Sequence, residues 1–231
     1  MEETPLFQIR RITLKDHTDI TLLLDGSGSM SIIKNDVIGG SNEFIESQQQ
    51  AGANASFTLA VFRTGNVLES NNTEYICTGL PIMDVAKLTP RSYLPSGGTP
   101  LLDAMGDAIT RTGERLAAMP ESDRPDKVVF VVFTDGEENS SHRFTKEQIR
   151  EMVEHQQSAY NWQFVYLGAN QDSFSEAGSI GFASAGISNF GLENTRAAYN
   201  TVSSNVALYR SKGTADSLSW TEEQRDLLVG N

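Results

Sequence analysis

Two apolar stretches that each run into an aspartate constrain the fold of this chain most strongly. Residues 127–134 (Lys-Val-Val-Phe-Val-Val-Phe-Thr) are almost continuously apolar and precede Asp135, and residues 21–24 (Thr-Leu-Leu-Leu) precede Asp25. A strand with apolar side chains at successive positions is buried on both faces, as in a parallel sheet that is covered by helices on either side. Strands and helices alternate along the chain, so the sequence predicts an α/β sandwich around a mainly parallel central sheet.

The expected elements follow from hydrophobic spacing and from turn residues. We expect strands at 19–25, 56–62, 127–134, 162–167 and 186–190, and a run at 66–76 that returns beside 56–62 as a hairpin. Apolar residues at helical spacing predict helices over 33–52, from 101 to about 116, from Thr145 through Val153, over 174–180 and over 198–209. Residues 77–98 contain several Pro and Gly residues and are expected to be a surface loop.

The helix that begins near residue 101 has one clear apolar face. Its members are Leu101, Met105, Ala108, Ile109, Thr112 and Leu116. Asp103, Asp107 and Glu114 fall off this face, and we expect them to be in solvent. Two capping signals stand out elsewhere: Thr145 with Gln148 predicts a capping box, and Asp172 is a candidate cap for the short helix at 174–180.

The chain is expected to hold one domain with two short extensions. Residues 1–17 form an N-terminal extension in which the alternating run 6–14 is a candidate edge strand. Residues 18–210 form the domain. Residues 211–231 form a polar C-terminal tail with a candidate short helix that starts at Thr221 and uses Leu227 and Leu228.

Charge and cysteine content narrow the classes of partner and compartment. The 231 residues carry 30 acidic and 18 basic side chains, a formal net charge of −12, which argues against nucleic acid or an anionic membrane as a partner. No apolar run is long enough to span a membrane, and the first residues lack the pattern of a signal peptide. The single cysteine, Cys77, is expected to be a packing residue, and we expect a cytoplasmic protein.

Oxygen-bearing side chains gather at the ends of the two apolar strands. Asp25, Ser27 and Ser29 form an Asp-x-Ser-x-Ser loop, Thr99 lies in Gly-Gly-Thr-Pro before a helix as its expected N-cap, and Asp135 ends the second strand. Parallel strands present their carboxyl ends at one edge of a sheet, where ligands bind. A hard divalent cation such as Mg²⁺ or Mn²⁺ prefers oxygen ligands, so this spacing predicts a metal site.

The same residues allow three other interpretations. Ser, Thr and Asp also favour caps and turns, but that explanation has to account for three separate segments. A phosphatase of the haloacid-dehalogenase type carries a second carboxylate two positions after the first, where this chain has Ser27. A dinucleotide-binding loop requires a third glycine where Ser31 stands. Glu137, Glu138 and Asn139 either border the site or are solvated.

Asp25-x-Ser27-x-Ser29 with Thr99 and Asp135 resembles the metal-ion-dependent adhesion site (MIDAS) of von Willebrand factor A (vWA) domains. The resemblance implies a Rossmann-like vWA fold with one antiparallel edge strand and helices on both faces. It also implies that the hydroxyls and the two aspartates bind Mg²⁺, or Mn²⁺, with Ca²⁺ less favoured. In such a site the metal keeps a position for a carboxylate of a protein partner, and Asp135 changes between direct and water-mediated contact with the metal.

The chain resembles stand-alone cytosolic vWA proteins of bacteria and phages, the tellurium-resistance type included, more than it resembles the long extracellular adhesins. The run 166–172 (Tyr-Leu-Gly-Ala-Asn-Gln-Asp) adds to this resemblance. We therefore expect a non-enzymatic, metal-dependent protein-binding module in the cytoplasm, or in the host cytoplasm if a phage encodes it. The alternatives are a structural or accessory subunit of a larger assembly and, less favoured, a Mg²⁺-dependent phosphohydrolase. The oligomeric state and the partner's identity stay open.

Overall fold

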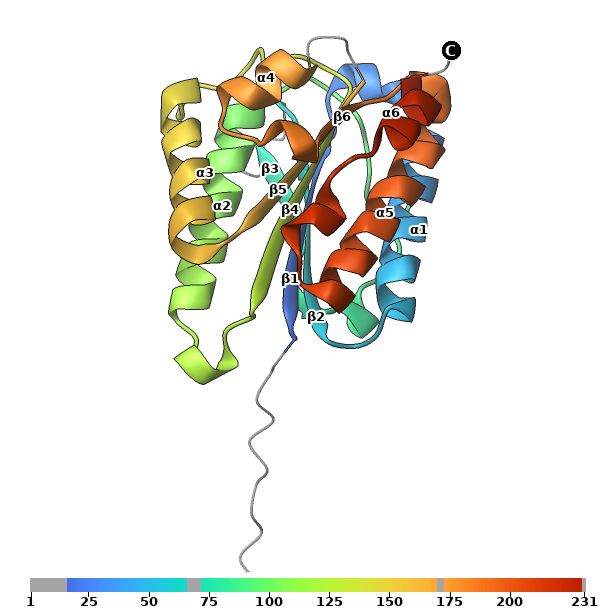
Figure 1. Cartoon of the computed structure of the whole chain (residues 1–231). Coiled ribbons are helices and arrows are strands. Elements are labelled where there is room, and N and C mark those ends of the chain that lie inside the picture. Colours follow the sequence, from blue (N-terminus) through green and yellow to red (C-terminus); the bar gives the residue numbers. More distant parts are fainter. Residues whose placement is uncertain (1–15, 66–71, 170–172, 230–231) are drawn as a thin grey trace, which may run out of the picture.

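The computed structural model describes residues 16–65, 72–169 and 173–229 (Figure 1). Within these ranges one six-stranded sheet has the strand order β3-β2-β1-β4-β5-β6. The strands are β1 (Thr18–Asp25), β2 (Ala55–Phe62), β3 (Thr73–Pro81), β4 (Lys127–Thr134), β5 (Gln163–Gly168) and β6 (Ile187–Asn189). Only the pairing of β3 with β2 is antiparallel among these strands, so the predicted fold class is confirmed.

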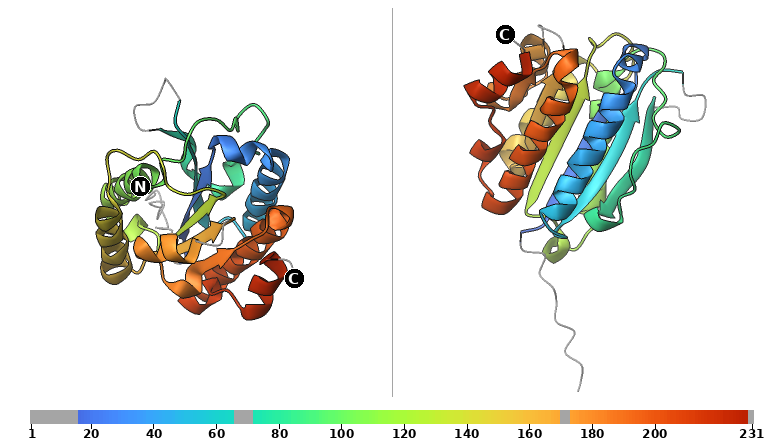
Figure 2. Two further views of the ribbon diagram at one scale, coloured as in Figure 1. Left: turned by 90° about the horizontal axis from the view of Figure 1, so that it is seen from above. Right: turned by 90° about the vertical axis from the view of Figure 1, so that its right-hand side faces the viewer.

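Helices cover both faces of the sheet. They are α1 (Lys34–Gln50), α2 (Leu101–Ala117), α3 (Lys146–Tyr160), α4 (Ser173–Ser179), α5 (Thr195–Lys212) and α6 (Glu222–Val229). Figures 1 and 2 show α2, α3 and α4 on one face and α1, α5 and α6 on the other. The strand order reverses between β1 and β4, so the site predicted after these two strands lies at the switch point of the sheet.

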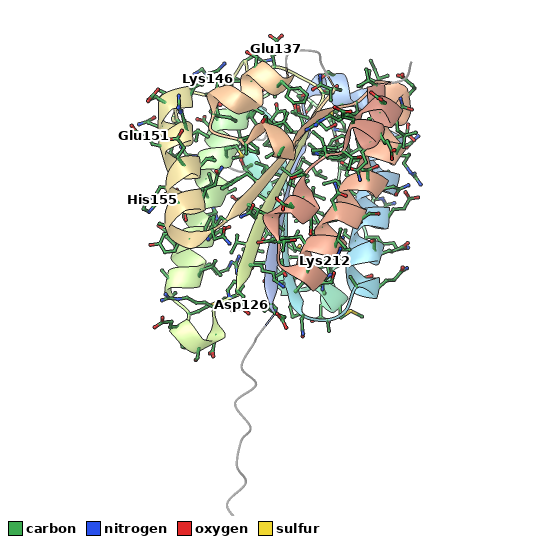
Figure 3. All side chains as sticks on the ribbon, in the orientation of Figure 1. Asp126, Glu137, Lys146, Glu151, His155 and Lys212 are labelled. Atoms are coloured by element: carbon green, nitrogen blue, oxygen red, sulfur yellow. The ribbon has the colours of Figure 1, made fainter. Side chains whose placement is uncertain are left out.

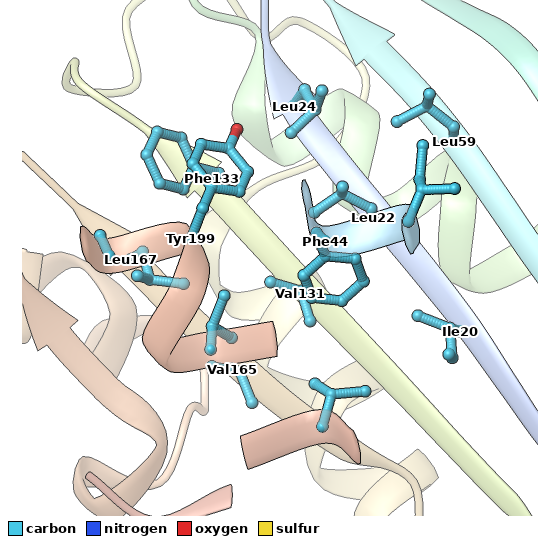
Figure 4. Packing of buried hydrophobic residues seen from close by; sticks show 14 of the residues in the cluster. Ile20, Leu22, Leu24, Phe44, Leu59, Val131, Phe133, Val165, Leu167 and Tyr199 are labelled. Carbon is cyan, nitrogen blue, oxygen red and sulfur yellow. The ribbon is translucent and has the colours of Figure 1, made fainter. Parts of the chain in front are cut away.

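Each face of the sheet has its own apolar core. Leu22 and Leu24 of β1 contribute to the core under α1 and α5, whereas Leu23 contributes to the core under α2 and α3. In the first core the ring of Phe133 stacks on Tyr199 of α5 at a centroid distance of 4.2 Å (Figure 4). Gly40 makes this packing possible, because a methyl group there would lie 2.3 Å from the Tyr199 ring. The continuous apolar pattern of β1 and β4 therefore reflects burial on both faces.

The predicted boundary of the third strand is wrong. Residues 77–81 were expected in a loop, but β3 continues to Pro81, which pairs with Ser56 of β2, and the register shifts around Leu59. Cys77 therefore lies inside the strand. Part of the predicted run 66–76 lies outside the described residues. The segment that follows β3 is also more buried than expected. Four of its residues lie in the core under α1: Ile82, Val85, Leu88 and Tyr93.

Two aspartates of α2 are buried, against the prediction that they are solvated. Asp103 is 2% exposed and accepts hydrogen bonds from the main-chain N–H groups of His142, Arg143 and Phe144. Asp107 is 7% exposed and accepts from the Tyr75 hydroxyl at 3.0 Å. The loop after β4 wraps over this end of α2 and supplies the donors for Asp103, whereas Asp107 accepts from Tyr75 of β3 and Arg111 of α2. Glu114, about two turns beyond Asp107, is exposed as predicted.

The C-terminal segment packs on the domain. Leu218, Trp220 and Leu228 belong to the core under α1 and α5, and Trp220 Nε1 donates to the carbonyl of Gly186 at 3.3 Å. The capping box of Thr145 and Gln148 is confirmed at the start of α3. The candidate edge strand at 6–14 and the candidate cap Asp172 lie outside the described residues. No helix in the described ranges has the length and hydropathy of a membrane span.

Candidate metal centre

The ends of β1 and β4 bring Asp25, Ser29 and Asp135 together. The two strands are adjacent and parallel, with Leu24 opposite Phe133, so both aspartates emerge at the same edge of the sheet. The Ser29 hydroxyl donates to Asp135 Oδ1 at 2.8 Å, across 106 residues of sequence. Within the Asp-x-Ser-x-Ser loop, the N–H of Ser27 donates to Asp25 Oδ1 at 2.7 Å, and the hydroxyls of Ser27 and Ser29 lie 3.0 Å apart.

Thr99 joins this group from the residue before Pro100. A methyl group added to Gly136 would lie 3.3 Å from Thr99 Oγ1, 3.8 Å from Ser29 Oγ and 4.0 Å from Asp25 Oδ2. These three oxygens therefore surround one small region of space. The prediction that Thr99 caps α2 is wrong, because Pro100 occupies the N-cap position and Thr99 uses its N–H to bond Asn139 Oδ1 at 2.9 Å.

The Asp-x-Ser-x-Ser loop is held by neighbouring main chain. The N–H of Gly28 donates to the carbonyl of Gly97 at 3.0 Å, and the N–H of Ser96 donates to the carbonyl of Gly26 at 2.8 Å. Gly26 also requires its small size, since a methyl group there would lie 2.6 Å from Val61 Cγ1. The buried Tyr93 hydroxyl donates to the carbonyl of Asp25 at 2.6 Å. The loop is therefore preorganised by contacts on both of its sides.

The carboxylates of the site lack a cationic partner among the described residues. Asp25 is fully buried, and burial raises its pKa to about 6 although the Thr134 hydroxyl and the Ser27 N–H stabilise the ionised form. Burial also raises the pKa of Asp135, against a hydrogen bond from Ser29. Both shifts mean that ionisation is costly without a positive charge nearby. A bound cation would supply that charge.

The chemistry of the donor set fits a hard divalent ion. Two carboxylates and three hydroxyls come from Asp25, Asp135, Ser27, Ser29 and Thr99, and all are oxygen donors, as Mg²⁺ and Mn²⁺ prefer. Asp25, Ser27 and Thr99 are at most 2% exposed, whereas Ser29 is exposed and Asp135 is half-buried. The five donor residues are thus buried on the side of Asp25, Ser27 and Thr99 and accessible to solvent on the side of Ser29 and Asp135.

Several supporting residues were not identified from the sequence. The sequence marks Thr134 only as a strand residue, yet its hydroxyl donates to Asp25 Oδ2 at 2.6 Å. Glu138 accepts from the N–H groups of Leu102 at the start of α2 and of Ser141. Together with Asn139, it fastens the loop after β4 to the segment that carries Thr99. Glu138 and Asn139 therefore support the site through the main chain, and Glu137 is exposed at its edge (Figure 3).

Comparison with known proteins defines the class of fold. No family model and no curated protein match the sequence. Solved structures do match: a von Willebrand factor type A protein from Catenulispora acidiphila shares 12% sequence identity at a TM-score of 0.51, over 87% of this chain and 43% of that one. Proximal thread matrix protein 1 from the mussel byssus shares 14% at a TM-score of 0.58, over 81% of this chain and 47% of that one. The fold is that of vWA domains.

Two of the matched structures are described as metal-bound. The mussel protein has also been solved with a zinc-occupied MIDAS motif. A manganese-loaded TRAP protein of Plasmodium vivax shares 18% identity at a TM-score of 0.50, over 79% of this chain and 71% of that one. This chain spans less than half the length of the mussel and Catenulispora chains it matches. At these identities the likeness establishes the fold, and the role of the site rests on the chain's own residues.

Proposed function

We propose that this chain is a non-enzymatic, metal-dependent protein-binding module. The observation that carries the proposal is the convergence of five oxygen-bearing side chains, from Asp25, Ser27, Ser29, Thr99 and Asp135, at a solvent-accessible edge of the sheet. These residues would hold Mg²⁺ or Mn²⁺. With three neutral hydroxyls among the donors, the ion would keep much of its charge and would attract a carboxylate from a protein partner.

A binding role is supported by the chemistry around the site. Catalysis by a bound metal needs a general base or an activated nucleophile near the reacting atoms. The described hydrogen bonds of Asp25, Ser29 and Asp135 are with hydroxyls, with a main-chain N–H and, between Ser29 and Asp135, with each other, not with His, Lys or Cys side chains. The fold is shared with a pilus adhesin of Lactobacillus rhamnosus GG, at 12% identity and a TM-score of 0.57.

We place the protein in the cytoplasm because its single cysteine provides no internal disulfide.

The first test is metal binding by the purified chain. Isothermal titration with Mg²⁺ and Mn²⁺ is expected to give one site in the wild type and none in Asp25→Ala or Thr99→Ala. Asp123→Ala and Thr110→Ala are matched controls, since both residues lie on or beyond α2, away from the site, and they are expected to bind as the wild type does. Circular dichroism verifies that all four variants fold.

The second test is partner capture. Immobilised chain is incubated with a bacterial lysate in Mg²⁺ or in EDTA, and retained proteins are identified by mass spectrometry. We expect proteins that are retained only in Mg²⁺, are absent with Asp25→Ala, and are released by a short carboxylate such as glutarate. Identical capture in EDTA and with Asp25→Ala would contradict the proposal. Release of phosphate from a panel of phosphoesters, lost in Asp25→Asn, would instead support the phosphohydrolase alternative.

A further inference from the structure

Two exposed apolar side chains lie on the segments that hold the metal-binding loop. Ile32 follows the short helical turn Gly28–Ser31 and is 83% exposed, the largest exposed fraction of any large apolar side chain in the described ranges. Leu94 is 52% exposed and follows Tyr93, whose hydroxyl bonds the carbonyl of Asp25. Exposure of this kind costs free energy in an unbound protein and is typical of a contact surface.

The segments that carry these two residues are tied to one another. The N–H of Gly28 donates to the carbonyl of Gly97, and Lys34 Nζ donates to the carbonyl of Pro90 at 3.1 Å. Along the sequence, Ile32 lies between Gly28 and Lys34, and Leu94 lies between Pro90 and Gly97. Figure 2 shows the loop before α2, in green, beside the start of α1, in blue, at the carboxyl end of the sheet. Ile32 and Leu94 thus lie on two neighbouring segments beside the candidate metal centre, and we call these segments, residues 28–36 and 90–97, its apolar flank.

The charge around the centre is asymmetric. The apolar flank carries two basic residues, Lys34 and the exposed Arg91, and one exposed acidic residue, Asp36. Arg91 forms no ion pair within the part of the chain that the structure describes. The opposite side is acidic: a hollow of about 200 Å³ is lined by Glu137, Glu138, Glu176, Lys146 and two serines. An acidic segment of a partner is therefore attracted to the apolar flank and repelled from the opposite side.

We propose that the partner approaches across the apolar flank, as an acidic segment that places one carboxylate on the metal and a neighbouring apolar side chain on Ile32 and Leu94. This inference rests on the proposed metal-dependent binding and adds the composition and direction of the bound segment. The metal supplies a charge that any carboxylate satisfies, whereas the apolar pair and Arg91 distinguish one acidic segment from another. Specificity then depends on residues that do not bind the metal.

A peptide library displayed on phage tests the inference without knowledge of the natural partner. Selections are run in Mg²⁺ on the wild type, on Asp25→Ala, on the double variant Ile32→Ser/Leu94→Ser, and on a matched control, Leu208→Ser/Leu227→Ser. The control also replaces two exposed leucines, 40% and 63% exposed, but on α5 and α6. Titration with Mn²⁺ and thermal unfolding are expected to give the same metal affinity and melting temperature for the wild type and the flank variant.

The wild type and the control are expected to enrich peptides with Asp or Glu and with Leu, Ile or Phe one to four positions away. The flank variant is expected to keep the acidic preference, to lose the apolar one, and to bind a selected synthetic peptide about tenfold more weakly. If it selects the same peptides with the same affinity, the inference is overturned while the proposed function stands. If the wild type selects no Mg²⁺-dependent peptides, or Asp25→Ala selects the same ones, the proposed function fails and this inference fails with it.

Discussion

The hydroxyl of Thr134 donates to the carboxylate of Asp25 at 2.6 Å, and both side chains are almost fully excluded from solvent. This bond joins the last residues of the two central strands, β1 and β4. It fixes one carboxylate oxygen of Asp25 directly beneath the candidate metal centre. The bond also stabilises the ionised carboxylate, yet burial outweighs it and the pKa of Asp25 is raised to about 6.

Asp25→Asn is expected to stabilise the metal-free protein at neutral pH while abolishing metal binding. The pKa of Asp25 is about 6 in the folded chain against 3.8 for an unperturbed carboxyl, so the folded state binds more protons between pH 4 and pH 6. The contribution of Asp25 to the free energy of unfolding therefore falls as the pH rises through this window. Removing the charge is expected to gain about 1–3 kcal/mol at pH 7.5 and nothing at pH 4. Urea unfolding in EDTA at both pH values measures this, and a loss of stability at pH 7.5 would contradict it.

Thr134→Val is expected to shift the pH dependence of metal binding upward. Protons and metal compete for Asp25, so wild-type affinity for Mg²⁺ is expected to fall as the pH is lowered through about 6. Loss of the Thr134 hydroxyl removes a hydrogen bond to the ionised form and raises the pKa of Asp25 further. Calorimetric titrations from pH 5 to pH 8 give the midpoint. Thr21→Val is the matched control, because the buried Thr21 hydroxyl has no hydrogen-bond partner among the residues that the structure describes, and its midpoint is expected to stay unchanged.

Gly136→Ala is expected to weaken metal binding by at least about tenfold without unfolding the chain. The added methyl group would lie within 4.0 Å of oxygens from Thr99, Ser29 and Asp25, in the space that these oxygens share. Gly113→Ala is the matched control: nothing lies within 4 Å of its new methyl group, and in the interior of α2 it is expected to stabilise by about 0.5–1 kcal/mol. Titration with Mn²⁺ and thermal unfolding of both variants separate the two effects. Equal metal affinities would count against the site.

Arg115→Met is expected to cost about 3–5 kcal/mol of stability and leave metal affinity unchanged. Arg115 pairs at 2.8 Å with Asp19, which is fully buried, so the substitution leaves an uncompensated charge in the core. Asp19 also accepts from the Ser56 hydroxyl, at the end of the sheet opposite the metal centre. Arg150→Met, which breaks an exposed pair with Glu154, is expected to leave the stability nearly unchanged, because solvent screens an exposed ion pair. Urea unfolding of both variants provides the comparison.

Trp220→Ala is expected to cost about 3–5 kcal/mol, because the indole is 4% exposed and packs with Leu218 and Leu228 in the core under α5. Leu227→Ala, on the same segment but 63% exposed, is expected to have little effect. A single unfolding transition of Leu227→Ala, which retains Trp220, measured by far-ultraviolet circular dichroism and by tryptophan fluorescence, would show that residues 215–228 unfold with the domain. A separate early transition would show that they do not.

The elements that the sequence predicted well are those whose signal is local. The eight residues of β4 and the capping box of α3 were predicted at their observed positions, because continuous apolarity and a Thr-x-x-Gln pattern are properties of short segments. The meeting of the Asp25 loop with Asp135 at one edge of the sheet was also predicted, because parallel strands end at the same edge. That these residues bind a metal stays a prediction.

The features that were missed depend on contacts distant in sequence. Asp103 looks solvated from helical spacing alone, but the loop at 142–144 supplies three N–H donors to it. Thr99 looks like a helix cap, but its N–H donates to Asn139 Oδ1, and its hydroxyl lies at the candidate metal centre. The extent of β3 depends on its pairing with β2, and nothing within residues 77–81 alone marks them as a strand.

The fastening of the loop after β4 limits how the candidate centre can respond to a bound partner. Thr134 is bound to Asp25, and the N–H of Glu138 donates to Glu176 while its carboxylate bonds the start of α2. Asp135 therefore belongs to a three-residue segment, 135–137, between Thr134 and Glu138, which are both held by hydrogen bonds. In the proposed complex, a partner that pulls on the metal is expected to rotate only the peptides on either side of Gly136. Displacing Asp135 farther would strain the hydrogen bonds that hold Thr134 to Asp25 and Glu138 to α2 and α4. We therefore expect small movements of Asp135 to be absorbed within residues 135–137.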